Sequence, residues 1–312
     1  MSGLRVSAAG GPARRTTTTT TAIAIALAVG VSALSGCSSG AGSGPGAEVL
    51  AALAEASYEE TPPTGITYVD AERARELLAE DAERFSFVAE LGTPPLGLMT
   101  LPEHRYGLDP ELASRTVTVG FAAPYGIWDG EFDAAAIVDE LAADGFTERE
   151  TEAGTVWVHH DRGIGLLVTD ERIHWGDEQL DPARTAASGE PVAEQDAYRD
   201  LAACLGDVYR ADFVETREDS EVVAYAYGHR AESATETSTV LCAVTESDTA
   251  ADEAAERLRE TVDGRPDQYR DAEIEPLDQD SPGVVVTVPD QPDQRPGWLL
   301  GHIRLAEALT RS

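Results

Sequence analysis

The sequence predicts an α+β protein whose antiparallel sheets carry helices on one face, built as two similar tandem modules over residues 66–180 and 190–312. Adjacent strand patterns are joined by short turns, which indicates antiparallel pairing and not the alternating pattern of a doubly wound parallel sheet. Both halves share a coarse order of helix, strand, helix, strand and strand, and the second half has one extra strand. Residue identity between the halves is slight, so their similarity is either a drifted duplication or a coincidence. With 42% hydrophobic residues, the chain can bury a substantial core.

The elements expected in the first half follow from caps and hydrophobic spacing. Asp70 is the expected N-cap of a helix that runs through Phe85, and Asp133 caps a second helix that Gly145 ends in the left-handed conformation. The remaining elements of this half are a proline- and glycine-rich connector over 92–110, a strand over 116–121, and a hairpin with strands over 155–160 and 164–169.

The second half shows the same alternation of helical and strand patterns. A helix over 196–209 is followed by strands over 221–228 and 237–245, and a helix then runs through 262 until Gly264 stops it. Strands over 272–276 and 284–288 come next, and a last helix carries Leu299, Ile303, Ala306 and Leu309.

The first 36 residues have the composition of a secretory signal peptide. Three arginines, Arg5, Arg14 and Arg15, precede an apolar run of thirteen residues over 22–34. A helix that crosses a bilayer needs about 20 apolar residues, so this run is too short to span one. A basic start, a short apolar core and a small-residue exit are typical of a cleaved export signal.

The apolar run ends in the sequence LSGC, residues 34–37, which resembles the lipobox of bacterial lipoproteins. The resemblance implies that the Cys37 sulfur receives a diacylglyceryl group and that cleavage before Cys37 makes it the new N-terminus. Residues 37–65 would then form a lipidated, flexible tether, and the membrane would be a partner through the lipid, on the extracytoplasmic face of the cell membrane. Two acyl chains suffice for stable anchoring. The alternative is a soluble secreted protein that is cut nearby, in which Cys37 is a stray thiol.

Composition excludes several classes of chemistry. All 23 basic residues are arginine, so P-loop, Schiff-base and Ser-x-x-Lys mechanisms are ruled out. Lysine and asparagine are both absent, which fits the GC-rich genome of an actinobacterium. The formal charge of −34 becomes −37 when the leader and its arginines are removed, and such a surface repels nucleic acid. The acidity is either a binding face for cations or basic partners, or general solvation in a saline habitat; the spread of acids along the whole chain favours solvation.

The cysteine count indicates one disulfide. If Cys37 carries lipid, Cys204 and Cys242 remain as a pair in an oxidising compartment. Cys204 lies beside an apolar helical stripe and Cys242 shares a strand face with two valines, so both are expected to point inward. The alternative is two buried free thiols.

Two segments offer candidate ligand-binding residues, both expected on loops. An aromatic pair with an acid on a loop can grip a sugar or a peptide, although such a tryptophan more often packs over a neighbouring helix. The candidates are Tyr125, Trp128 and Asp129 in PYGIWDG, and His104, Arg105 and Tyr106 in LPEHRYG. No catalytic residue, metal site or cofactor is expected, because the spacings that hold metals, phosphates or activated nucleophiles do not occur.

These observations favour a non-catalytic binding or scaffolding role for a membrane-anchored protein, with an unknown protein or small molecule of the cell envelope as partner. A solute-binding lipoprotein of an importer is one alternative, which would need two parallel lobes around a cleft. An envelope hydrolase is the other, which would need a converging pair of carboxylates.

Overall fold

The computed structural model describes residues 45–58, 65–86, 105–120, 125–182, 190–216, 220–292, 294–296 and 303–311, which belong to one compact unit. The predicted signal peptide, Cys37 and residues 38–44 and 59–64 of the predicted tether lie outside these residues. Residues 45–58 of that tether are described and include a helix over 47–53.

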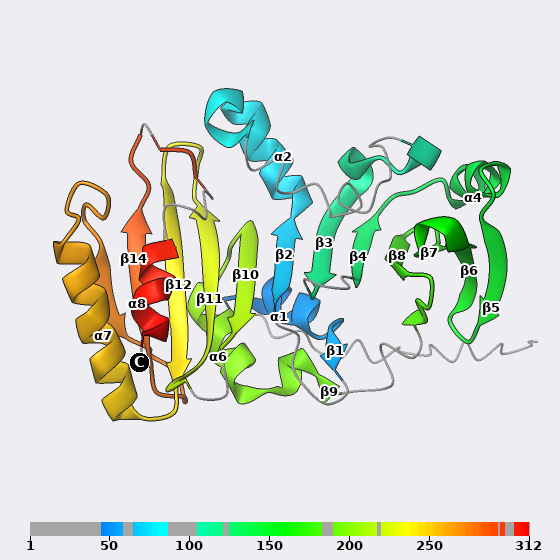
Figure 1. Ribbon diagram of the computed structural model, residues 1–312. Helices are drawn as coiled ribbons and strands as arrows, with labels where there is room; N and C mark the ends of the chain where they lie inside the picture. Colours follow the sequence, from blue (N-terminus) through cyan, green and yellow to red (C-terminus); the bar gives the residue numbers. More distant parts are fainter. Residues whose placement is uncertain are drawn as a thin grey trace, which may run out of the picture. The chain divides into compact units, whose positions relative to one another are not determined.

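Twelve described strands form one antiparallel sheet (Figure 1). In spatial order they are β13 (Glu273–Pro276), β14 (Gly283–Pro289), β12 (Thr237–Thr245), β11 (Val222–Ala231), β10 (Arg210–Glu215), β2 (Ile66–Asp70), β3 (Ala113–Val119), β4 (Tyr125–Gly130), β8 (Arg172–Asp177), β7 (Ile164–Val168), β6 (Gly154–His159) and β5 (Thr147–Thr151). A separate pair joins β1 (Ser57–Tyr58) to β9 (Glu190–Pro191). The α+β class and the antiparallel pairing are therefore confirmed.

The sheet runs without interruption across both predicted modules. Strands β2 and β10 pair with each other, Ile66 opposite Phe213 and Val69 opposite Arg210. The two predicted modules therefore share one sheet. Their origin by duplication stays a prediction. Five strands of the sheet are absent from the sequence-based assignment: β2, β4, β5, β8 and β10. Each has five or six residues, and β5 is a charged edge strand of sequence TERET.

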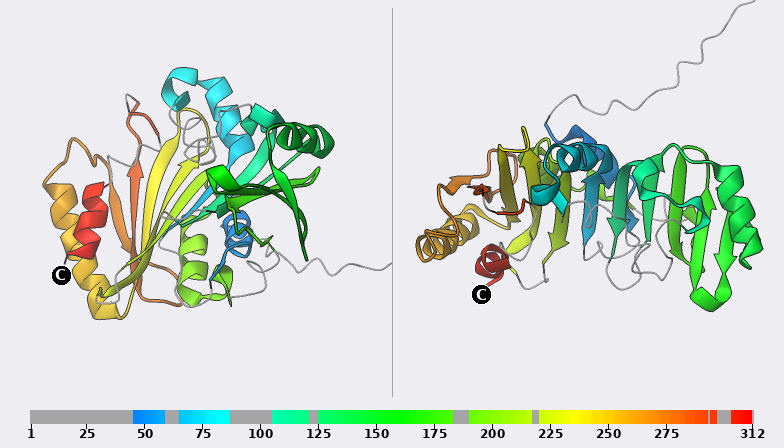
Figure 2. Two further views of the ribbon diagram at one scale, coloured as in Figure 1. Left: turned by 45° about the vertical axis from the view of Figure 1, so that its right-hand side comes forward. Right: turned by 90° about the horizontal axis from the view of Figure 1, so that it is seen from above.

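Helices pack on both faces of the sheet, where the sequence led us to expect one. Val240, Cys242 and Val244 of β12 face α1 (Ala47–Leu53) and α6 (Asp196–Leu205), whereas Leu241 and Ala243 face the opposite way. That second face is covered by α2 (Ala71–Glu80), α4 (Ala134–Ala143), α7 (Asp248–Asp263) and α8 (Ile303–Thr310). Helices α7 and α8 lie side by side (Figure 2). The physical reason is visible in β12, whose apolar run does not alternate with polar residues, as is typical of a strand buried on both faces.

The predicted helix caps are confirmed at both sites. The carboxylate of Asp70 accepts a hydrogen bond from the Arg73 amide at 2.8 Å, and that of Asp133 accepts one from the Ala136 amide at 3.0 Å. The first of these helices ends at Glu80 and not at Phe85. Asp81 leaves the helical conformation and its own carboxylate caps the amide of Arg84 at 3.0 Å, so that residues 82–86 begin a new helical turn.

Candidate functional site

Tyr125, Trp128 and Asp129 lie on strand β4 and not on a loop, which corrects the sequence-based placement. Side chains alternate along a strand, so Tyr125 and Asp129 point to one face and Trp128 to the other. Trp128 is 1% exposed and packs in the core beneath α4. The three side chains therefore do not converge on one ligand, and the indole offers no surface for stacking.

Packing explains why glycine occurs in this strand. A Cβ atom on Gly126 would lie 2.5 Å from the ring of Trp175, which crosses the strand at that position. Glycine thus permits a close approach here, within a segment that the sequence alone indicated as a loop.

Asp129 is the centre of a four-charge cluster. One carboxylate oxygen accepts from Arg172 Nε at 2.6 Å and the other from Arg115 Nε at 2.8 Å. Arg172 also donates to both carboxylate oxygens of Glu55, at 3.0 and 3.1 Å. Glu55 follows α1, so the two arginines tie that helix to β3, β4 and β8. The cluster is electrically balanced and its side chains are between 19% and 32% exposed, which assigns it a structural role.

Of the second candidate group, only Tyr106 has a described side chain. His104 and the side chain of Arg105 lie outside the described residues. Tyr106 is 3% exposed, and its hydroxyl contacts Asp144 and accepts from Arg162 Nη1 at 2.5 Å. Burial raises the pKa of Tyr106, and the bond to Asp144 raises it further. The residue therefore joins the segment before β3 to α4 and to the β6–β7 turn.

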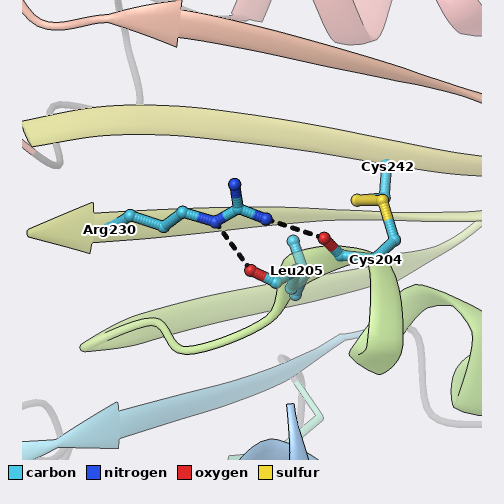
Figure 3. The surroundings of a disulfide bond; sticks show 4 residues. All are labelled: Cys204, Leu205, Arg230 and Cys242. Atoms are coloured by element: carbon cyan, nitrogen blue, oxygen red, sulfur yellow. Dashed lines mark hydrogen bonds between the residues drawn. A yellow bond between two sulfur atoms is a disulfide. The ribbon is translucent and has the colours of Figure 1, made fainter. Parts of the chain in front are cut away.

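Cys204 and Cys242 are at disulfide distance, as the sequence led us to expect (Figure 3). The bond joins α6 to β12 across the core, with Cα atoms 6.3 Å apart. Beside it, Arg230 donates to the carbonyl oxygens of Leu205 at 2.9 Å and Cys204 at 2.8 Å. These bonds satisfy carbonyls that a helix end leaves without partners, so α6 is fixed by a covalent bond and by a cap.

A buried ion pair lies on the opposite face of the sheet. Arg210 donates to both carboxylate oxygens of Asp212, at 2.6 and 2.9 Å, and the Thr67 hydroxyl donates to one of them at 2.8 Å. Burial opposes ionisation of Asp212, but the Arg210 charge and these hydrogen bonds hold its pKa below the usual value. The pair therefore stabilises the β2–β10 junction as long as Asp212 is ionised.

Sequence reasoning missed a cleft of about 310 Å³ at the end of β2. Its walls come from the start of α1, the end of β2, the first turn of α2, and the segments around residues 206–209 and 231. Three carboxylates line it, those of Glu48, Asp70 and Asp207. No sequence motif could have indicated this cleft, because its residues come from distant parts of the chain. A second cleft, of about 650 Å³, lies between β10, β11, α7 and α8.

The described part of the chain has neither a set of metal ligands nor a membrane-spanning helix. Within it, no three histidine, cysteine or acidic side chains are grouped in a way that could bind a metal ion. Nor does any described helix combine the length and the apolar character needed to cross a membrane.

The chain is thus an α+β protein with one long antiparallel sheet and an acidic cleft. No protein-family model and no curated protein matches it. Solved structures of a protein named TP0453, in three crystal forms, are similar at TM-scores of 0.40 to 0.42 with 9% to 11% sequence identity. The match covers 74% to 83% of this chain and 91% to 97% of TP0453.

Proposed function

We propose that the protein is a non-catalytic binding or scaffolding protein, held at the extracytoplasmic face of the cell membrane by lipid on Cys37. The Cys204–Cys242 disulfide is the observation that carries this proposal. Structural disulfides persist in oxidising compartments and are rare in the cytosol. The bond is therefore consistent with export, which the signal-like leader independently predicts.

Eight residues lead from Cys37 to Pro45, where the described chain begins. Their maximum reach is about 28 Å, which is an upper limit on the distance between the proposed anchor and Pro45. A net charge near −37 for the mature chain is repelled by anionic headgroups, so attachment would come from the lipid and not from the surface of the body.

The ion-paired aspartates of the fold have structural partners. Asp129 and Asp144 pair with arginines of other elements, and Asp212 pairs with Arg210 of its own strand. A solute-binding lipoprotein of the two-lobed parallel type would have a different architecture from the continuous antiparallel sheet described above.

Metabolic labelling with an alkyne-tagged fatty acid in the native host tests the anchor. The wild-type protein and a Ser38→Ala control should both carry the label, and Cys37→Ser should carry none. Protease treatment of intact spheroplasts should degrade the labelled body, because it lies outside the cytoplasmic membrane. Label on the Cys37→Ser protein, or no label on the wild type, would contradict the proposal.

A further inference from the structure

A tyrosine hydroxyl faces the acidic cleft at the end of β2 without a described hydrogen-bond partner. Tyr68 is only 3% exposed and its ring packs in the core between the sheet and α1. Among the described residues, none forms a hydrogen bond with its hydroxyl. The hydroxyl oxygen itself is not one of the fully buried polar atoms that lack a partner, so it is open to the cleft, where an entering group can form a hydrogen bond with it.

The charges around this hydroxyl are those of the cleft. Burial raises the pKa of Tyr68, and Asp70, Glu48 and Asp207 raise it further, with Arg115 acting in the opposite direction. Tyr68 and the three carboxylates that act on its phenol all line the cleft. Tyr68 therefore stays protonated at neutral pH and presents a neutral oxygen that can accept a hydrogen bond.

One cation also lines the cleft, and its bonding groups are already engaged. Arg73 Nη1 pairs with Glu76 at 2.9 Å, and Nη2 donates to the Ala231 carbonyl at 3.3 Å. Its amide is bonded to one carboxylate oxygen of Asp70, the N-cap of α2. Three carboxylates against one guanidinium leave the lining with negative charge.

We propose that this cleft binds an alkylammonium group, with the ammonium among Glu48, Asp70, Asp207 and the Tyr68 hydroxyl and its hydrocarbon stem against Val49 and Val208. A cation of this kind fits both parts of the lining, because the carboxylates attract its charge and the apolar side chains desolvate its stem. A bare metal ion fits less well, since no described group of acids is arranged as a metal site. The volume of about 310 Å³ lies at the lower end of small-molecule sites.

The same chemistry can come from a free amine or from a lysine side chain of another protein. Isothermal titration of the full-length protein at low ionic strength separates the two sources, with butylamine as the first probe and the peptide acetyl-Gly-Lys-Gly-amide as the second. Butanol, which lacks the charge, serves as the control ligand. Binding of butylamine alone assigns a free amine, and binding of the peptide assigns a protein partner. No binding of either probe would overturn the proposal.

Matched variants show whether binding occurs in the cleft. The double variant Glu48→Gln/Asp207→Asn removes two exposed carboxylates of the lining and should weaken binding about tenfold. The control double variant Asp252→Asn/Glu260→Gln changes the net charge equally on the exposed face of α7 and should bind as the wild type does. If both double variants weakened binding equally, the amine would be attracted by the overall negative charge of the protein and not by this cleft, and the proposed site would be wrong.

The hydroxyl is tested separately. Tyr68→Phe should weaken binding about fivefold, because only the acceptor oxygen is lost. Tyr125→Phe, which removes a hydroxyl that donates to the Ser57 carbonyl outside the cleft, should leave binding unchanged. Unchanged binding by Tyr68→Phe would remove the tyrosine from the site.

This inference deepens the proposed binding role and rests on the proposed function for its biological setting. The two fail distinguishably. A wild-type protein without fatty-acid label would contradict the anchor but leave the titration unaffected, whereas a labelled protein that binds neither amine would contradict only the cleft.

Discussion

Loss of the Cys204–Cys242 bond should lower stability by about 4 kcal/mol. The cysteines are 38 residues apart in sequence, and the chain-entropy relation for a loop of that length gives about 3.9 kcal/mol at 25 °C. At about 2–4 °C per kcal/mol for a chain of this size, the melting temperature should fall by roughly 10 °C. Cys242 is fully buried, so replacing it with alanine also removes packing contacts and adds to the loss.

Urea unfolding followed by tryptophan fluorescence measures this loss, because Trp128 and Trp175 are buried in the core. The experiment uses a Cys37→Ser background, so that only the paired cysteines respond to reductant. Reductant should destabilise this protein and have no effect on the Cys204→Ala/Cys242→Ala variant. An unfolding midpoint that reductant does not move, or two reactive thiols in the denatured, unreduced protein, would refute the reasoning.

Three further outcomes are expected. In thermal melts, Gly46→Ala should destabilise the protein by several kcal/mol more than Gly145→Ala. A Cβ atom on residue 46 would lie 2.0 Å from a backbone oxygen of α6, whereas a Cβ atom on residue 145 would meet nothing within 4 Å. Equal losses of stability would contradict the docking of α1 on α6. Asp129→Asn should cost about 2 kcal/mol in urea unfolding because it weakens charge-assisted bonds to Arg172, and no loss would contradict the structural role of the cluster. Burial and the Arg172 charge lower the pKa of His174 from its usual 6.5. As pH drops below about 6.5, the unfolded chain therefore takes up a proton on His174 before the folded protein does, and the free energy of unfolding should fall. His174→Gln should lose less stability over this pH range, and an identical dependence of stability on pH would contradict this.

Local signals predicted those elements whose ends are determined by their own residues. Asp133 and Gly145 bracket α4 as the sequence indicates, the first as N-cap and the second at a φ of +92°. Strand β2 gave no comparable signal. Its five residues run directly into the cap of α2, and their strand conformation depends on pairing with β3 and β10. Strand β10 is distant in sequence: Thr67 of β2 bonds to Asp212 of β10, 145 positions further along the chain.

The candidate binding residues show the same limit. The segment around Trp128 was expected to be a loop, but it is a strand in which Gly126 makes room for an indole from another strand. Glu48, Tyr68 and Asp207 form a cleft only because α1, β2 and the segment after α6 meet in the folded protein. Their positions in the sequence do not indicate that they meet, so residue type and periodicity could not have identified the cleft.

The central claim, anchorage through Cys37, is tested most directly by mass spectrometry of the amino-terminal peptide of the protein purified from its own membranes. The account predicts a chain that begins at Cys37 and carries a diacylglyceryl group on that sulfur. A chain that retains the leader, or one that begins beyond Cys37 without lipid, would contradict it.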